Sequence, residues 1–265
     1  MMRRAILLLT FVAAAATLGA CNDLPNRGRY APAAVSAVDG SRAAVATAVA
    51  DPARPAADRE RDAARKPSEI LAFARLAPGQ RVADMLPGGG YFTRMFARAV
   101  GDSGRVIAFL PTEAPAQYVT AIRTVSDDDA AYANIDLLQQ PSPTFRPGEP
   151  VDLVFTAQNY HDLHAFGSDV AAFNRAIFAA LRPGGLYVVI DHAAADGTGV
   201  TQADTLHRIE QSVVRREIEA AGFVLDGESP ALRNPADPRT ATVFDPSIRG
   251  RTDQFALRFR KPFPR

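Results

Sequence analysis

The stretch that decides the fold is RVADMLPGGGYFTRMF, residues 81–96. A short apolar run at its start ends in an acid, Asp84. Three consecutive glycines follow: Gly88, Gly89 and Gly90. The next residues place apolar side chains at helical spacing, and Gly101 stands where a left-handed residue often ends a helix. The stretch therefore predicts a strand, a glycine-rich turn and a helix, in which bare main chain lets a ligand approach closely.

The glycine spacing excludes two common nucleotide-binding motifs. The dinucleotide fingerprint Gly-x-Gly-x-x-Gly fails because Thr93 occupies the third glycine position. The phosphate-binding pattern Gly-x-x-x-x-Gly-Lys-[Ser/Thr] is absent as well. An acid at the strand end followed by paired glycines remains, and a purely structural turn in another α/β protein is the open alternative.

Asp84, Gly88 and Gly90 resemble the first motif of the class I S-adenosylmethionine (SAM) methyltransferases, Asp/Glu-x-Gly-x-Gly-x-Gly, with Leu86 in place of the first glycine. About one hundred residues later, Leu-Arg-Pro-Gly-Gly before an apolar run is a second landmark of that family. The resemblance covers about residues 55–263 and is closest to a poorly characterised bacterial group. The further marks of that group are Pro87-Gly88-Gly89-Gly90-Tyr91, Asn159-Tyr160-His161 and Asn234-Pro235-Ala236-Asp237.

The resemblance implies an α/β, Rossmann-like class I methyltransferase fold: a seven-stranded, mainly parallel sheet with helices on both faces and a C-terminal antiparallel hairpin. Apolar runs predict the strands that follow the first, at 106–110, 135–138, 151–157, 186–190 and 223–226, and alternation of apolar and polar residues predicts the last, at 254–260. Helical patterns are expected at 58–66, 68–76, 91–100, 118–125, 168–181 and 207–221. In the last strand, Arg258 and Arg260 are expected to point outward.

The cofactor implied by the resemblance is SAM. The expected cofactor-binding residues are Asp84, Gly88, Gly89, Gly90, Glu113 and Asn159. The family's ribose-binding acid at the end of the second strand is replaced by Leu110, and the nearest acid is Glu113. Three alternatives stay open: Glu113 turns inward, the ribose is held differently, or SAM is not bound.

Polar residues follow the fourth and fifth predicted strands, whose carboxyl ends border the ligand crevice of such a sheet. Asn159, Tyr160 and His161 are expected to face the glycine turn. His161 or His192 could deprotonate a substrate hydroxyl, because histidine titrates near neutrality; a loop-capping histidine is the alternative. The candidate catalytic residues are Tyr160, His161, Asp191 and His192.

No metal site is expected. His161, His192 and His207 would have to come from three separate loops, and no short His-x-x-x-His pair is present. Four arginines in the proline-rich segment 228–252 favour either an anionic small-molecule substrate or a solvated rim.

The N-terminus reads as an export signal. Residues 1–20 combine a basic start, an apolar run and small residues before the only cysteine, Cys21. This pattern resembles a bacterial lipobox and predicts a lipoprotein anchored at Cys21 on the periplasmic side of the cell envelope; cleavage by the ordinary signal peptidase is the alternative. Residues 21–54 are expected to be a tether, with a short lid helix as one reading, and 55–265 the methyltransferase-like domain.

Composition limits the partners. Thirty basic and 29 acidic residues give a formal net charge of +1. This balance indicates neither a positive electrostatic field that would attract nucleic acid nor a polybasic patch that would bind a membrane. A lipid anchor would be the only membrane contact, and the oligomeric state stays open. Two functions follow as hypotheses: a SAM-dependent methyltransferase with a small-molecule acceptor, or an envelope protein of methyltransferase fold that binds a ligand or performs another reaction.

Overall fold

The computed structural model of the protein describes residues 31–264, with side chains described for 39–128 and 130–264. The expected signal peptide, Cys21 and the first part of the tether lie outside these residues. Within the described part, no helix combines the length and the apolar character needed to cross a bilayer.

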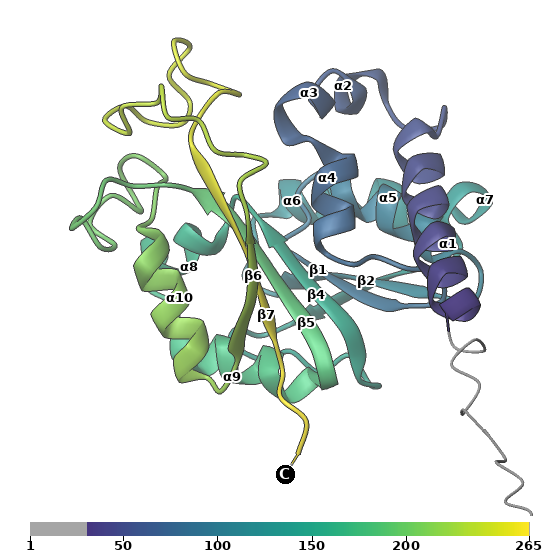
Figure 1. Cartoon of the computed structure of the whole chain (residues 1–265). Coiled ribbons are helices and arrows are strands. Elements are labelled where there is room, and N and C mark those ends of the chain that lie inside the picture. Colours follow the sequence, from purple (N-terminus) through teal and green to yellow (C-terminus); the bar gives the residue numbers. More distant parts are fainter. Residues whose placement is uncertain (1–30, 265) are drawn as a thin grey trace, which may run out of the picture.

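Seven strands form one sheet in the order β3-β2-β1-β4-β5-β7-β6 (Figure 1). The strands are β1 Arg81–Met85, β2 Arg105–Pro111, β3 Ile135–Gln140, β4 Val151–Ala157, β5 Leu181–His192, β6 Val224–Ser229 and β7 Gln254–Arg260. The pairs among β1 to β5 are parallel, whereas β7 runs antiparallel to both β5 and β6. The predicted fold class is confirmed, including the terminal hairpin.

Helices cover both faces of the sheet (Figure 1). The helices are α1 Ala31–Ala50, α2 Ala56–Arg59, α3 Asp62–Arg65, α4 Pro67–Phe73, α5 Tyr91–Val100, α6 Ala116–Ser126, α7 Asp129–Tyr132, α8 Tyr160–Ala165, α9 Val170–Ala180 and α10 Gln211–Ala220. Side chains from α1, α4, α5 and α6 share one buried cluster with the sheet, and those from α8, α9 and α10 share the other. Both faces of the central strands are therefore buried, as expected for strands with nearly continuous apolar sequences.

Four local predictions were wrong. The expected helix 58–66 is interrupted, so that α2 and α3 form two short turns. The helix expected from residue 168 begins two residues later, at Val170, because Asp169 caps α9 by accepting the N–H of Ala172. His207 and Arg208 lie in a turn before α10, which begins at Gln211. Arg258 is buried and pairs with Asp226 at 2.7 Å, because the end of α4 covers it, with the guanidinium 4.7 Å from the ring centre of Phe73.

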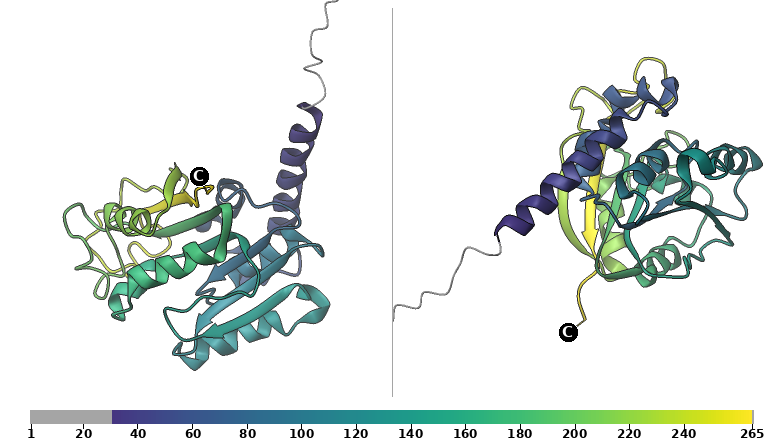
Figure 2. Two further views of the ribbon diagram at one scale, coloured as in Figure 1. Left: turned by 90° about the horizontal axis from the view of Figure 1, so that it is seen from below. Right: turned by 90° about the vertical axis from the view of Figure 1, so that its right-hand side faces the viewer.

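Helix α1 has 20 residues and is longer than the short helix expected within residues 21–54. Figure 2 shows its first turns extending beyond the body of the sheet. In its last turns, Val45 and Ala48 are buried in the same core as α4 and α5. The packed part of the protein therefore begins before residue 55, the position at which the sequence suggested that the domain starts.

Candidate functional site

The glycine turn has the backbone of a ligand-binding loop. Leu86, Gly88 and Gly90 all adopt left-handed φ angles, of 56°, 56° and 80°. Such an angle is uncommon for leucine, and its N–H donates to Phe109 in β2 at 2.9 Å. Leu86 thus adopts the left-handed backbone conformation expected of the glycine it replaces, and this conformation is strained for leucine. A Cβ added at Gly88 or Gly89 would meet no atom within 4 Å, so the main chain there is open to a ligand.

Asp84 is buried beneath this turn at the end of β1. Its carboxylate accepts a hydrogen bond from the hydroxyl of Thr93 in α5 at 2.6 Å. Burial raises the pKa of Asp84 to about 7, although Thr93 and the nearby Arg65 act in the opposite direction. A cation placed beside Asp84 would therefore favour its ionised form.

Asn159 connects the ends of β1 and β4. Its amide donates to the carbonyls of Met85 at 3.3 Å and Leu86 at 3.0 Å. Its carbonyl oxygen accepts a hydrogen bond from the Thr156 hydroxyl. Asn159 lies beside the glycine turn as expected, but its polar atoms hold the turn in place.

Arg65 of α3 lies across the crevice between the glycine turn and the carboxyl end of β4. Its guanidinium donates to Gln158 and lies 4.6 Å from the ring centre of Tyr91 and 5.4 Å from that of Phe92. Burial, and secondarily Arg61, lower the pKa of Arg65 to about 10. The cavity beside these groups measures about 10 Å³, which is room for about one water molecule.

Ion pairs hold α2 and α3 over the start of α5. The Asp62 carboxylate accepts from the Tyr91 hydroxyl at 2.6 Å and pairs with Arg54, also at 2.6 Å. Asp58 pairs with Arg94 at 3.0 Å. Helices α2 and α3 therefore lie next to the glycine turn, against the first turn of α5.

The second strand offers no acid to the crevice. Leu110 is buried at its end, and Glu113 is exposed, with its carboxylate accepting the main-chain N–H of Ser142 at 3.3 Å. A hydrogen bond with its own main chain and, after it, the one from Ser142 lower the pKa of Glu113. The Glu113 carboxylate is therefore engaged in a hydrogen bond to the loop that follows β3.

His161 and Asp191 form a buried pair at the carboxyl end of β5. The His161 Nδ1 lies 2.8 Å from Asp191 Oδ1, and the main-chain N–H of His161 donates to Asp191 Oδ2, also at 2.8 Å. Burial acts to lower the pKa of His161, but the carboxylates of Asp191 and Asp162 raise it above the ordinary value. A histidine oriented by a carboxylate in this way is a suitable proton acceptor.

The other two catalytic candidates differ. His192 lies close, with its ring centre 6.3 Å from that of His161, and its Nδ1 is 2.8 Å from the Thr252 hydroxyl. Burial lowers the pKa of His192 to about 4, so the ring is neutral near pH 7. Tyr160 does not face the glycine turn as expected. Its hydroxyl is buried with Asn174 of α9, at 2.8 Å, and Glu217 of α10, at 3.0 Å.

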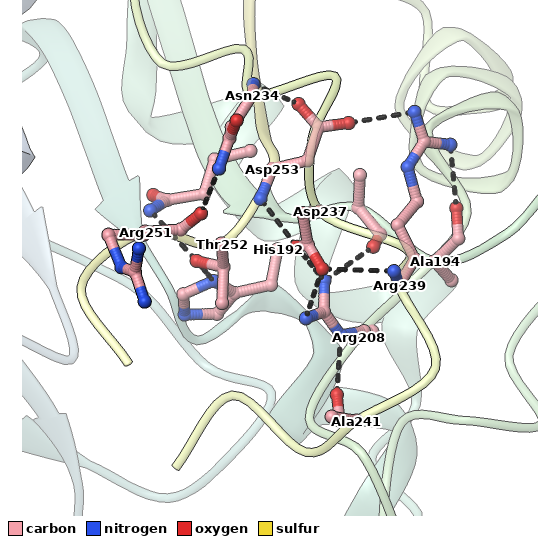
Figure 3. A network of polar contacts seen from close by, with 12 residues as sticks. His192, Ala194, Arg208, Asn234, Asp237, Arg239, Ala241, Arg251, Thr252 and Asp253 are labelled. Atoms are coloured by element: carbon pink, nitrogen blue, oxygen red, sulfur yellow. Dashed lines mark hydrogen bonds and ion pairs between the residues drawn. The ribbon is translucent and has the colours of Figure 1, made fainter. Parts of the chain in front are cut away.

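A buried polar network fixes the segment 228–252 above the carboxyl edge (Figure 3). Arg208, fully buried, pairs with Asp237 at 2.8 Å and donates to the carbonyls of Ala193 and Ala241. Asp253 pairs with Arg239 at 2.7 Å and with Arg233 at 2.9 Å. Two of the four arginines that suggested an anionic substrate are thus paired with a carboxylate of the protein itself.

Comparisons with known proteins place the fold. No protein-family model matches the chain, and no curated protein matches it. Among solved structures, it is similar to a SAM-dependent methyltransferase from Aquifex aeolicus, with a TM-score of 0.53, 17% identity, and coverage of 76% of this chain and 97% of that one. It is also similar to a SAM-dependent methyltransferase from Mesorhizobium loti, with a TM-score of 0.54, 17% identity, and coverage of 76% and 99%. The cyclase SpnF matches with a TM-score of 0.55, 16% identity, and coverage of 79% and 82%.

These similarities show that the chain has the fold of the class I methyltransferases. The same fold carries a cyclase among the matched structures, so the reaction has to be argued from the site. Sequence reasoning missed Arg65 and Gln158, which lie at the centre of the crevice. Arg65 is one of several arginines in a charged stretch, and nothing in its spacing distinguishes it.

Proposed function

We propose that this protein is a SAM-dependent methyltransferase acting on a small molecule. The observation that carries the proposal is the glycine turn: Leu86 retains a left-handed backbone, and the main chain at Gly88 is open, at the centre of a sheet with methyltransferase strand order. The buried acid Asp84 beneath it suits a ligand that carries a sulfonium and an ammonium group. When bound, SAM would supply an electrophilic methyl group.

The chain's own residues would bind and orient the reactants, which is the main source of rate enhancement in such a site. Gly88 to Gly90 and Asp84 would hold the cofactor, and Asn159 keeps the turn fixed. The His161–Asp191 pair would accept the proton of a hydroxyl acceptor. Entry of the cofactor requires displacement of Arg65, because ligand pockets measure about 300–1,000 Å³ and the present cavity about 10 Å³.

A second function, a methyltransferase-fold protein that does not methylate, is favoured by two observations. Leu110 is buried where the resembled family has a ribose-binding acid, and Arg65 fills the crevice with a cation of the protein's own. Calorimetric titration with SAM and with S-adenosylhomocysteine separates the two functions. If the protein is a methyltransferase, both ligands should bind saturably, and Asp84→Ala should remove this binding. Dissociation constants weaker than about millimolar for both, which means less than about 4 kcal/mol of binding free energy, would favour the second function.

SAM affinity is expected to rise with pH up to about 7 and then to level off. The pKa of Asp84 is about 7 before binding, and a bound cation favours the carboxylate. Below pH 7 the protein therefore has to release one proton when it binds, so affinity falls about tenfold per pH unit. Calorimetry between pH 5.5 and 8.5 measures this slope. Asp84→Asn should bind weakly with no slope, and a wild-type affinity independent of pH would refute the assignment of Asp84.

The proposed location is the periplasmic side of the bacterial envelope, with Cys21 acylated. The basic start, the apolar run and the small residues before Cys21 support it. Growth of the producing cells with labelled palmitate should label the wild-type protein, and Cys21→Ser should remove the label. Equal labelling of both, or of neither, would contradict a lipid anchor at Cys21.

A further inference from the structure

Three side chains with metal-ligand atoms meet beside the buried His161–Asp191 pair. They come from α8, which supplies His161 and Asp162, and from the turn before α10, which supplies His207. His161 Nε2 lies 3.3 Å from Asp162 Oδ1, and His207 Nδ1 lies 3.9 Å from the same oxygen. All three candidate ligand atoms fall within 4.8 Å of one another.

The hydrogen bonds of Asp191 decide which nitrogen of His161 carries a proton. The Asp191 carboxylate accepts the main-chain N–H groups of His161 and His192, each at 2.8 Å, and faces His161 Nδ1 at 2.8 Å. Nδ1 is therefore the protonated nitrogen. In the neutral ring, Nε2 then directs a lone pair at an oxygen of Asp162. Two acceptors at 3.3 Å repel each other, so a positive species belongs between them.

A proton and a metal ion would satisfy this cluster to different extents. A proton on His161 Nε2 would join His161 to Asp162 but would leave His207 Nδ1 at 3.9 Å, beyond hydrogen-bond distance. A zinc-type ion bound at about 2.0–2.1 Å in tetrahedral geometry sets its ligand atoms about 3.3–3.4 Å apart. The separations of 3.3 and 3.9 Å from Asp162 lie near this value, and the separation between the two imidazoles is within 4.8 Å, so His207 would have to move inward on binding.

The backbone at His207 is a second and independent feature. His207 has a left-handed φ of 54°, and strained conformations of this kind cluster at functional sites. The ring of Phe244 contacts it edge to face, with the centres 4.8 Å apart, and the His161 ring lies 5.4 Å away. The segment after β5 and the segment before β7 thus direct this imidazole toward α8.

We propose that His161, Asp162 and His207 bind a divalent transition-metal ion of the zinc type. Asp191 orients His161 as the outer carboxylate of a carboxylate–histidine–metal unit. Three protein ligands leave a coordination position for water or for an oxygen of the acceptor, as in catalytic zinc sites. The sequence predicted no metal site because the ligands would come from separate loops, but the fold brings those loops together. With the ion bound, His161 acts as a ligand, so the role of proton acceptor proposed above for the His161–Asp191 pair applies only to the metal-free protein.

Metal binding can be measured without knowledge of the reaction. The protein, purified without a histidine tag and treated with a chelator, is titrated calorimetrically with Zn²⁺, and Co²⁺ absorption reports the geometry. We expect about one equivalent of Zn²⁺ and a four-coordinate Co²⁺ spectrum. His207→Asn, which tolerates the left-handed backbone, and Asp162→Asn should each weaken binding by at least ~100-fold. Asp191→Asn should weaken it by about 10–100-fold.

The matched control is His164→Ala, on the same helix but outside the cluster. His164 lies 3.1 Å from Glu217 and belongs to none of the three candidate ligands. Its variant should bind Zn²⁺ as the wild type does. Failure of the wild-type protein to bind Zn²⁺ would overturn the proposal. Unchanged affinity in both His207→Asn and Asp162→Asn, or an equal loss in His164→Ala, would also overturn it. SAM binding does not enter this test, so the metal site and the methyltransferase proposal can fail separately.

Discussion

Gly88→Val is expected to reduce SAM affinity by at least ~100-fold, about 2.8 kcal/mol. In the protein without ligand, a Cβ added at this position meets no atom within 4 Å. The new methyl groups therefore occupy the space that a cofactor needs for close contact with the main chain. Calorimetric titration of both proteins measures the change.

Gly148→Val is the matched control. Gly148 also has a left-handed φ, of 83° against 56° at Gly88, and is also free of neighbours within 4 Å. It lies before β4, at the amino-terminal ends of the parallel strands, whereas Gly88 lies at their carboxyl ends. Both variants therefore carry a similar backbone penalty, about 1–2 kcal/mol of folding free energy. Only Gly88→Val should lose affinity, and equal affinities in the two variants would show that the glycine turn does not hold the ligand.

Arg208→Ala is expected to lower the free energy of unfolding by about 3–5 kcal/mol, the range measured when one partner of a buried ion pair is removed. Arg208 is fully buried, and its two ion-pair contacts with Asp237 measure 2.8 and 3.3 Å (Figure 3). Its loss leaves Asp237 charged and buried with only main-chain donors, and leaves the carbonyls of Ala193 and Ala241 without this donor. Urea unfolding at neutral pH gives the difference.

The control for this variant is Arg215→Ala. Arg215 pairs with Glu219 at 3.1 Å on the surface of α10, where both side chains are well exposed. Such i,i+4 pairs contribute about 0.3–0.5 kcal/mol. If Arg208→Ala unfolded at the same urea concentration as Arg215→Ala, the network would not be what fixes the segment 228–252 to the sheet.

Much of the fold could be predicted because each strand carries its own signal. Val151–Ala157 was predicted from an apolar run buried on both faces, and Gln254–Arg260 from the alternation of apolar and polar side chains. Both strands have the predicted bounds. The resemblance then supplied the mainly parallel arrangement of the strands and the antiparallel hairpin at the end. Arg258 was misplaced because alternation alone cannot show that the end of α4 covers it.

The site could be predicted only in part. Asp84 and the glycines are read from local spacing, and His161, Asp191 and His192 meet because parallel strands end at one edge. The orientation of Tyr160 depends on Asn174 and Glu217, which lie on helices that follow later in the chain. The position of Arg65 in the crevice and the approach of His207 to Asp162 depend on segments whose packing leaves no local pattern. Contacts of this kind follow from the tertiary structure alone.

A crystal structure of the protein grown with S-adenosylhomocysteine tests the central claim most directly. The account predicts density for the nucleoside between Gly88 and the carboxyl end of β4, with Arg65 displaced from Gln158. Arg65 still bound to Gln158, in a crevice without ligand at millimolar S-adenosylhomocysteine, would contradict the claim that this crevice is a cofactor site.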